Sequence, residues 1–308
     1  MRKSSSDKAL WNAISAKRAK IAIVGLGYVG LPLAMAFVRK GFPVIGIDLD
    51  QGRIERIRQG RSYIEDIPSA QLRQAVRRGR LEATDTYDPL RDSDVIIICV
   101  PTPLNRVKDP DLSHVLKATE AIRDHLRIGQ LVILESTTYP GTTEEVVLPT
   151  LEHSGLQVGR DFFLCFSPER IDPGNKKFPF SKIPKVVGGI TPVCTRLGSR
   201  VYESVVEKVY PVSRARTAEM AKLLENTFRI VNIGLVNELA QVAEALKIDI
   251  WEAVRAASTK PFGFMPFYPG PGIGGHCIGI DPIYLSWKAR FHGVDIHFIE
   301  LARRINAE

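Results

Sequence analysis

A glycine-rich hexapeptide, Gly25-Leu26-Gly27-Tyr28-Val29-Gly30, stands between two segments of opposite character. The apolar run Ile21–Val24 before it predicts a buried strand, and Leu33–Val38 after it continues as a helix. A second apolar run ends at Asp48, 18 residues after Gly30. The order strand, glycine turn, helix, strand and acid is typical of a dinucleotide-binding βαβ unit.

Each part of this motif suits a pyrophosphate and a ribose. Gly25 allows a tight turn, Gly27 lets the backbone approach the phosphates, and Gly30 lets the helix pack closely on the strand. The carboxylate of Asp48 can accept both ribose hydroxyls and repels a 2′-phosphate, which favours NAD over NADP, although Arg53 nearby could hold such a phosphate. The expected cofactor-binding residues are Gly25, Gly27, Tyr28, Val29, Gly30, Asp48, Arg53, Pro101, Thr102, Ser136 and Thr137.

Short apolar runs then alternate with helix-length amphipathic segments, which predicts a parallel sheet covered on both faces. The fold class is therefore α/β, a doubly wound Rossmann-type sheet followed by a helical domain with one long helix over Thr217–Leu246. We expect a helical lead-in over residues 1–19, an NAD-binding domain over 20–212 and a central helical domain over 213–308. The predicted strands are Ile21–Val24, Pro43–Ile47, Val95–Val100, Leu131–Glu135, Phe162–Phe166 and Lys185–Val187.

Composition excludes several other classes. The formal charge is +8, but the basic residues are dispersed, which argues against a nucleic-acid partner. Glycines and a proline interrupt the apolar stretch 21–38, which argues against a membrane span. The four cysteines and six histidines show no metal-ligand spacing, so no metal is expected. A polar N-terminus and unpaired cysteines favour the cytoplasm.

The segment Pro271–Pro282 is the strongest catalytic signal. Cys277 follows four glycines within seven residues, an arrangement that leaves a sulfur accessible to substrate. A helix starting there would lower the pKa of the thiol, and Asp281 could orient a water or an ammonium group. Lys222 and Asn226, four residues apart on the long helix, could stabilise an oxyanion, or they could be ordinary helix surface.

Six motifs resemble the family of UDP-glucose and GDP-mannose dehydrogenases, from Ile21 to the end of the chain. They are GLGYVGLPLA at 25–34, CVPTP at 99–103, ESTTYPGTTE at 135–144, SPER at 167–170, AEMAKLLENTFR at 218–229 and GPGIGGHCIGIDP at 270–282. The resemblance implies two successive oxidations by NAD⁺ that take C6 of a nucleotide sugar from alcohol to carboxylate.

The resemblance also implies individual roles. Cys277 matches the nucleophile that forms a thiohemiacetal and then a thioester, while Lys222 and Asn226 match the pair that stabilises oxyanions. Asp281 matches an acid that orients Lys222 and the hydrolytic water. Thr137 matches a threonine near that water, and Glu169 matches a glutamate implicated in acid–base work and hydrolysis.

Two stretches look most like the members that oxidise UDP-N-acetylglucosamine: TKPFGFMPFYPGPGIGGHC at 259–277, and FIELARRIN. UDP-N-acetylmannosamine, UDP-N-acetylgalactosamine and UDP-glucose remain open as substrates. Family members continue into a second α/β domain that binds UDP, which we expect to be absent here, so that the chain would bind NAD and turn over poorly. The alternatives are an NAD-binding module without turnover and a hydroxyacid dehydrogenase. A homodimer through the long helix is expected.

Overall fold

The structure is a computed structural model that describes residues 5–170, 178–273 and 276–307, and the side chains of Ser5, His276, Cys277 and Ile278 lie outside this description. It divides into two compact units. The first comprises residues 1–102 and 111–220, and the second comprises residues 103–110 and 221–308.

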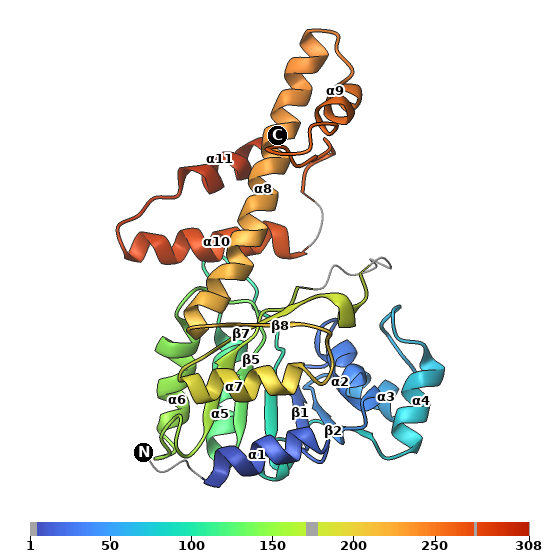
Figure 1. The fold of residues 1–308 in the computed structure, drawn as a ribbon, viewed down its shortest axis with the longest axis vertical. Coiled ribbons are helices and arrows are strands. Elements are labelled where there is room, and N and C mark those ends of the chain that lie inside the picture. The colour runs from blue at the N-terminus through green and yellow to red at the C-terminus, as the bar shows by residue number, and fades with distance from the viewer. Residues whose placement is uncertain (1–4, 171–177, 274–275, 308) are drawn as a thin grey trace. The chain divides into compact units, whose positions relative to one another are not determined.

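The first unit is built on one eight-stranded sheet with the order β3-β2-β1-β4-β5-β6-β7-β8 (Figure 1). Strands β1 to β6 pair in parallel, β7 runs antiparallel to β6, and β8 is parallel to β7. The strands are β1 Ile21–Val24, β2 Val44–Ile47, β3 Leu81–Thr84, β4 Val95–Ile98, β5 Leu131–Leu134, β6 Phe163–Phe166, β7 Lys185–Gly189 and β8 Val209–Val212.

This architecture confirms the predicted doubly wound fold, with two differences. The sheet is parallel as predicted except between β6 and β7, which pair antiparallel. The strands β3 and β8 were not predicted, and both are edge strands. Their sequences, Leu-Glu-Ala-Thr and Val-Tyr-Pro-Val, lack the continuous apolar character of a strand buried on both faces, and proline is tolerated at a sheet edge.

Two hydrophobic cores lie on opposite faces of the sheet because successive side chains of a strand point to opposite sides. Ile21, Ile23, Val95 and Ile97 belong to one core, and their neighbours Ala22, Val24, Ile96 and Ile98 belong to the other. The first core receives side chains from five helices: α1 (Ser5–Ser15), α2 (Gly30–Arg39), α3 (Gln51–Arg58), α4 (Ser69–Arg77) and α7 (Pro192–Tyr202). The second core receives side chains from α5 (Ser113–His125), α6 (Leu148–Glu152), the turns η1 (Asp88–Asp92) and η2 (Thr143–Val147), and the start of α8 (Ala215–Ala245).

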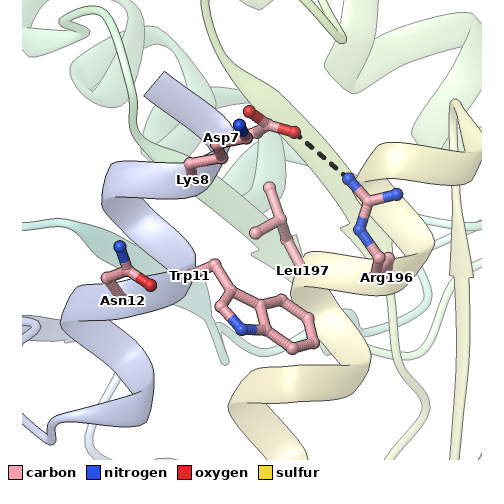
Figure 2. Close-up of a pocket in the computed structure, with 6 residues that line it drawn as sticks. All are labelled: Asp7, Lys8, Trp11, Asn12, Arg196 and Leu197. Atoms are coloured by element: carbon pink, nitrogen blue, oxygen red, sulfur yellow. Dashed lines mark hydrogen bonds and ion pairs between the residues drawn. The ribbon is translucent and has the colours of Figure 1, made fainter. Parts of the chain in front are cut away.

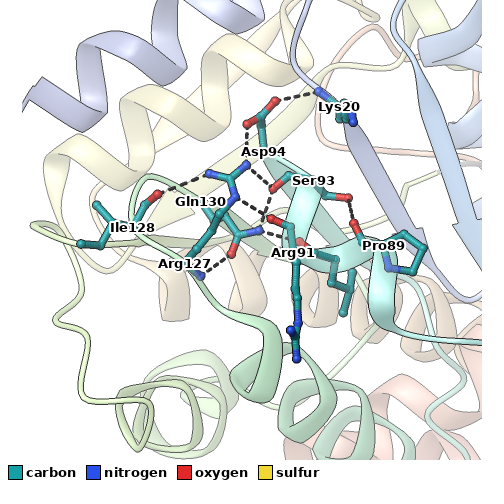
Figure 3. Close-up of polar contacts among 9 residues, drawn as sticks. Lys20, Pro89, Arg91, Ser93, Asp94, Arg127, Ile128 and Gln130 are labelled. Atoms are coloured by element: carbon teal, nitrogen blue, oxygen red, sulfur yellow. Dashed lines mark hydrogen bonds and ion pairs between the residues drawn. The ribbon is translucent and has the colours of Figure 1, made fainter.

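A polar cluster ties together the starts of the central strands (Figure 3). The Gln130 side chain is fully buried, donates to the carbonyls of Leu90 (2.7 Å) and Ser93 (2.6 Å), and accepts from the Arg127 N–H at 2.7 Å. Arg127 also donates to Asp94 at 2.8 Å, and Asp94 accepts from the Lys20 N–H at 2.9 Å. Because Lys20, Asp94 and Gln130 directly precede β1, β4 and β5, the cluster holds these three strands in register.

The second unit is helical. Helix α8 (Ala215–Ala245) has 31 residues, which confirms the predicted long helix, and its residues from 221 onward belong to this unit. The remaining helices are α9 (Ile250–Ala257), α10 (His276–Phe291) and α11 (His297–Ile305). Helix α11 packs on α8 at Gly234, where an added Cβ would lie 3.3 Å from the Cα of Ala302. The Asn306 side chain donates to the Ile230 carbonyl at 3.2 Å, and this hydrogen bond also joins the end of α11 to α8.

Candidate functional site

The glycine turn joins the end of β1 to the start of α2. Gly25 has φ +95°, and a Cβ there would lie 2.5 Å from the Cys99 carbonyl oxygen on the neighbouring strand. A Cβ at Gly30 would lie 1.8 Å from the Gly25 carbonyl oxygen, so close packing of helix on strand requires glycine. Gly27 differs, because its Cβ would meet nothing within 4 Å. The backbone at Gly27 therefore faces open space that a ligand can occupy.

The N-terminus of α2 faces the same edge of the sheet as this turn. Val29 precedes the helix and provides no side-chain hydrogen bond to its first N–H groups. Such a terminus carries partial positive charge and favours an anion. The turn also lies where the strand order reverses direction, between β1 and β4, which is where open α/β sheets bind nucleotides.

Asp48, directly after β2, is buried and fixed by three donors. Its Oδ2 accepts from the Leu26 N–H at 2.7 Å and from Arg53 Nη1 at 3.2 Å, and its Oδ1 accepts from the Asp50 N–H at 2.9 Å. The first bond ties the acid to the glycine turn itself. The carboxylate is thus oriented before any ribose is present, with acceptor capacity left on Oδ1.

A pocket of about 340 Å³ opens beside this acid. The Tyr63 hydroxyl closes one side by donating to the Leu26 carbonyl at 2.5 Å. Burial, and then the charge of Asp48, raise the pKa of Tyr63, so it remains a neutral donor. The pocket is lined by Gly27, Tyr28, Asp50, Gly52, Arg53, Arg56, Tyr63 and Ile64. Its size and its two arginines fit part of a dinucleotide.

The other expected cofactor contacts follow the two adjacent strands. Pro101 and Thr102 lie after β4, with Pro101 exposed and Thr102 half-buried. Ser136 and Thr137 lie after β5, and the Ser136 hydroxyl donates to the Val100 carbonyl at 2.7 Å. The buried Ser136 side chain therefore links the two strand ends, whereas the half-buried Thr137 is more accessible.

A buried ionic cluster lies close by, at the ends of β5 and β6. The Lys185 ammonium pairs with Glu135, approaches Glu169 Oε2 at 3.4 Å and donates to the Pro168 carbonyl at 3.0 Å. Tyr202 donates to the other oxygen of Glu135 at 2.7 Å. Burial raises the pKa of Glu135 to about 7, although the Lys185 charge opposes this shift. The candidate Glu169 is thus held by a lysine that sequence reasoning did not single out.

A second buried carboxylate, Glu219 near the start of α8, fixes the loop that follows Thr137. It accepts from the Gly141 N–H at 2.5 Å, the Thr143 N–H at 2.9 Å and the Thr143 hydroxyl at 2.6 Å. Burial raises its pKa to about 7 in spite of these donors. The sequence signal for Glu219, as for Glu135 and Lys185, is a charged residue inside or bordering an apolar run.

In the second unit the structure brings together two of the predicted catalytic residues. Asn226 Nδ2 donates to Asp281 Oδ2, which joins α8 to α10 across 55 residues of sequence. Lys222 lies one turn before Asn226, and all three side chains are at least nine-tenths buried. Cys277 is the second residue of α10, one turn before Asp281, but its side chain lies outside the described residues.

Another pocket, of about 390 Å³, lies between α1 and α7 in the first unit (Figure 2). Asp7 and Arg196 form an ion pair across it at 3.1 Å, and Trp11 lines it. Arg200 stacks on the Trp11 ring at 5.3 Å. None of the predicted site residues lines this pocket, so these contacts serve mainly to attach the N-terminal helix.

Two features are absent from residues 5–170, 178–273 and 276–307. No helix there is long and apolar enough to cross a bilayer. No group of three or more His, Cys, Asp and Glu side chains in that part of the chain is arranged to hold a metal ion. The cysteines Cys99, Cys165 and Cys194 are buried and unpaired.

Strand order, glycine turn and oriented acid together define a Rossmann-type dinucleotide-binding protein. The chain belongs to the UDP-glucose/GDP-mannose dehydrogenase family: the NAD binding domain of that family matches residues 19–206 and its central domain matches residues 216–308. The first unit accordingly contains an NAD-binding domain, which confirms the predicted cofactor. The open backbone at Gly27 fits such a dinucleotide.

Several similar proteins are named as dehydrogenases of UDP-linked N-acetyl sugars. The chain is 44% identical over 292 residues to UDP-N-acetyl-D-glucosamine 6-dehydrogenase of Pseudomonas aeruginosa, covering 94% of this chain and 68% of that protein. It is 39% identical to UDP-N-acetyl-D-mannosamine dehydrogenase of Pyrococcus horikoshii, over 93% of this chain and 68% of that protein. The solved structure of the Pyrococcus enzyme superposes with a TM-score of 0.88 over 94% of this chain and 68% of that chain. The chain thus spans about two thirds of the length of these relatives.

Proposed function

We propose that the chain carries the catalytic residues for NAD-dependent oxidation of C6 of UDP-N-acetylglucosamine to the uronic acid, with Cys277 as the covalent nucleophile. Two two-electron oxidations are required, and the aldehyde formed by the first must not escape before the second. A covalent bond to the enzyme prevents that loss. Two NAD⁺ molecules, bound one after the other at the glycine turn, would each accept one hydride.

For cofactor binding, the proposal assigns the pyrophosphate to the turn at Gly27 and the N-terminus of α2. Asp48 accepts the ribose hydroxyls through its free acceptor capacity, while Arg53 and Tyr28 border the pocket that receives the adenosine half. Pro101, Thr102, Ser136 and Thr137 border the remainder. The support is the open backbone at Gly27 and the prior orientation of Asp48 by Leu26.

For the covalent step, the Cys277 thiolate adds to the aldehyde carbon, and the carbonyl oxygen becomes an oxyanion. Lys222 and Asn226 donate to that oxygen. Oxidation of the resulting thiohemiacetal gives a thioester, and attack by water releases the carboxylate and restores the thiol. The first turn of a helix lowers the pKa of a thiol, and Cys277 lies in the first turn of α10.

The observation that carries this proposal is the hydrogen bond between Asn226 and Asp281. It brings the Lys222/Asn226 pair of α8 together with α10, whose second residue is Cys277. Because the Asn226 amide donates to a carboxylate, its orientation is fixed, and its remaining N–H can be directed at substrate. Asp281 then orients the ammonium of Lys222 and the hydrolytic water. For Thr137 and Glu169, in the first unit, the proposal keeps the roles in hydrolysis that the resemblance implies.

The substrate assignment rests on the relatives, two of which are named UDP-N-acetyl-D-glucosamine 6-dehydrogenase at 44% and 42% identity. UDP-N-acetyl-D-mannosamine is the second candidate, because several relatives at 35–39% identity are named for it.

The cytoplasm remains the predicted compartment.

The test measures NADH formation and covalent labelling with each UDP-sugar. We expect NAD binding by calorimetry, and a mass increase on Cys277 matching the acyl group in a single turnover with UDP-N-acetylglucosamine. Cys277→Ala should abolish labelling while NAD binding persists. NAD binding without UDP-sugar binding or labelling would instead support the NAD-binding module, and undiminished NADH output from Cys277→Ala would refute covalent catalysis.

We also propose that the chain forms a homodimer through α8. This helix presents apolar side chains at intervals of three, four or seven residues, all at least 45% exposed: Leu224, Phe228, Leu235, Leu239 and Val242. Exposed charges of both signs, Arg229 and Glu238, border the apolar stripe. A second copy of the same helix is the occupant that matches both the stripe and its mixed charges, because a two-fold contact uses one surface twice.

A further inference from the structure

We propose that Lys185 is a positioning residue for the hydrolytic half of the reaction, holding Glu169 as an oriented carboxylate against the segment that carries Thr137. This inference rests on the proposed function for the roles of Glu169 and Thr137. It adds a residue that no motif of the sequence identified. All the contacts that support it lie within the first unit.

The Lys185 ammonium contacts two strand ends at once. On one side it pairs with Glu135, the residue that follows β5 and precedes Ser136 and Thr137. On the other side it reaches the Pro168 carbonyl at 3.0 Å and Glu169 Oε2 at 3.4 Å, both after β6. Because β7 runs antiparallel to β6, its first residue lies at the carboxyl end of β6. The reversal of this strand thus delivers the lysine to the functional edge.

Both flanking segments are fixed by further bonds. Tyr202 on α7 donates to the second oxygen of Glu135 at 2.7 Å, which leaves the first for Lys185. The Arg170 N–H donates to Glu169 Oε1 at 2.7 Å, which leaves Oε2 toward Lys185. The two carboxylates are therefore held on either side of one ammonium group.

The charges of this cluster make the lysine a permanent cation. Burial alone would lower the pKa of Lys185, but the carboxylates of Glu135 and Glu169 outweigh it and raise the pKa. Among the described residues, the Arg170 guanidinium also borders the cluster and donates to the Pro184 carbonyl at 2.8 Å. Cys99, Cys165 and Tyr202 face it as well, and burial raises the pKa of all three, so they stay neutral. Two carboxylates share one ammonium, and burial raises the pKa of Glu135 to about 7. The ammonium between the two carboxylates therefore stays charged where Glu135 titrates.

The test titrates Glu169 directly and requires no turnover. Protein labelled with carbon-13 at glutamate Cδ is followed by NMR against pH, and Glu169→Gln assigns the signal. The variants are Lys185→Met, the double variant Glu135→Gln/Lys185→Met, and Tyr202→Phe. The double variant removes the Lys185–Glu135 ion pair as a unit, so Glu135 is not left buried without its cation and the protein can fold if the single variant cannot. Tyr202→Phe is the matched control, because it perturbs Glu135 and leaves Lys185 in place.

We expect the titration midpoint of Glu169 to rise by about one pH unit in the double variant, since an ammonium within hydrogen-bonding range stabilises the carboxylate. It should stay near the parent value in Tyr202→Phe. In single turnovers with NAD and UDP-N-acetylglucosamine, the thioester on Cys277 should persist longer in the double variant. An unchanged Glu169 midpoint in that variant overturns the inference. Absence of any thioester in the parent protein contradicts the proposed function instead, and the titration still decides the role of Lys185.

Discussion

Gly25, Gly27 and Gly30 belong to one sequence motif, but their surroundings in the structure differ. Steric contact fixes Gly25 and Gly30, whereas Gly27 faces open space. A substitution at Gly30 therefore acts on folding, and one at Gly27 acts on ligand binding. An alanine substitution at each position, which adds one methyl group, therefore separates the effect on folding from the effect on ligand binding.

We expect Gly27→Ala to change the free energy of unfolding by less than about 0.5 kcal/mol, as for a surface substitution. Its affinity for NAD should fall at least tenfold, a loss of about 1.4 kcal/mol, because the methyl group occupies the ligand's space. Gly30→Ala should instead lose about 3 kcal/mol of stability by overpacking. Urea unfolding and calorimetric titration with NAD measure the two quantities. Equal effects of both substitutions on folding would contradict the assignment.

Residue types and spacing were sufficient to predict the glycine turn, Asp48 and the pair Lys222/Asn226 as candidates. They did not predict the Lys185–Glu135 pair, because its members lie 50 residues apart and meet only through sheet pairing. The sequence indicates this pair only by a lysine at the start of a buried strand. Burial demands a partner for such a charge, but the sequence does not say which carboxylate supplies it.

Among the elements, the interior strands were predictable and the edge strands were not. Runs such as Val95–Ile98 and Leu131–Leu134 are buried on both faces and read as uninterrupted apolar sequence. Strand β3 has a single buried face, and β8 contains a proline and is half-exposed. The antiparallel direction of β7 also has no local signature, because direction is set by the connection from β6.

The cluster at the strand starts predicts a specific stability loss. Gln130→Leu removes two donors and one acceptor from a fully buried position, so Leu90, Ser93 and Arg127 lose backbone hydrogen bonds. We expect a loss of about 2–4 kcal/mol in urea unfolding. Arg127→Ala breaks a partly exposed ion pair with Asp94. We expect the loss of that ion pair to lower the free energy of unfolding by about 1 kcal/mol or less. If Gln130→Leu left the free energy of unfolding unchanged, the cluster would not be holding the strands.

At the scale of the whole molecule, Glu219 links stability to pH. Its pKa in the folded protein is raised to about 7 from 4.5. Between these values the folded state binds more protons than the unfolded chain, so the contribution of Glu219 to stability is lost as pH rises from 4.5 to 7. The loss is about 3 kcal/mol. Glu219→Gln, which cannot titrate, should remove this part of the pH dependence.

The measurement is the free energy of unfolding at several pH values for the parent, Glu219→Gln and the exposed control Glu120→Gln. The difference between parent and Glu219→Gln should change across pH 4.5–7, while the difference between parent and Glu120→Gln should not. A parallel pH dependence in parent and Glu219→Gln would show that the carboxyl titrates normally.

The proposed homodimer predicts a change of mass in solution. Leu235→Asp combined with Leu239→Asp places two charges in the exposed apolar stripe of α8 and should convert dimers to monomers in sedimentation experiments. Ile128→Asp, at a position 61% exposed in the first unit, is the matched control and should remain dimeric. A monomeric parent protein at micromolar concentration would refute the dimer.

The order of the strands has a consequence for how the chain reaches its folded state. Ile21 pairs with Val95, 74 residues away, and this is the most distant register in the sheet. The Cys99 carbonyl on β4 is also what confines Gly25, so the nucleotide-binding turn is complete only after this pairing forms. Closing such long loops is slow, and partly paired sheets expose edges that aggregate. Competence to bind NAD should therefore be acquired late in folding, and added NAD should slow unfolding without accelerating the refolding of the chain.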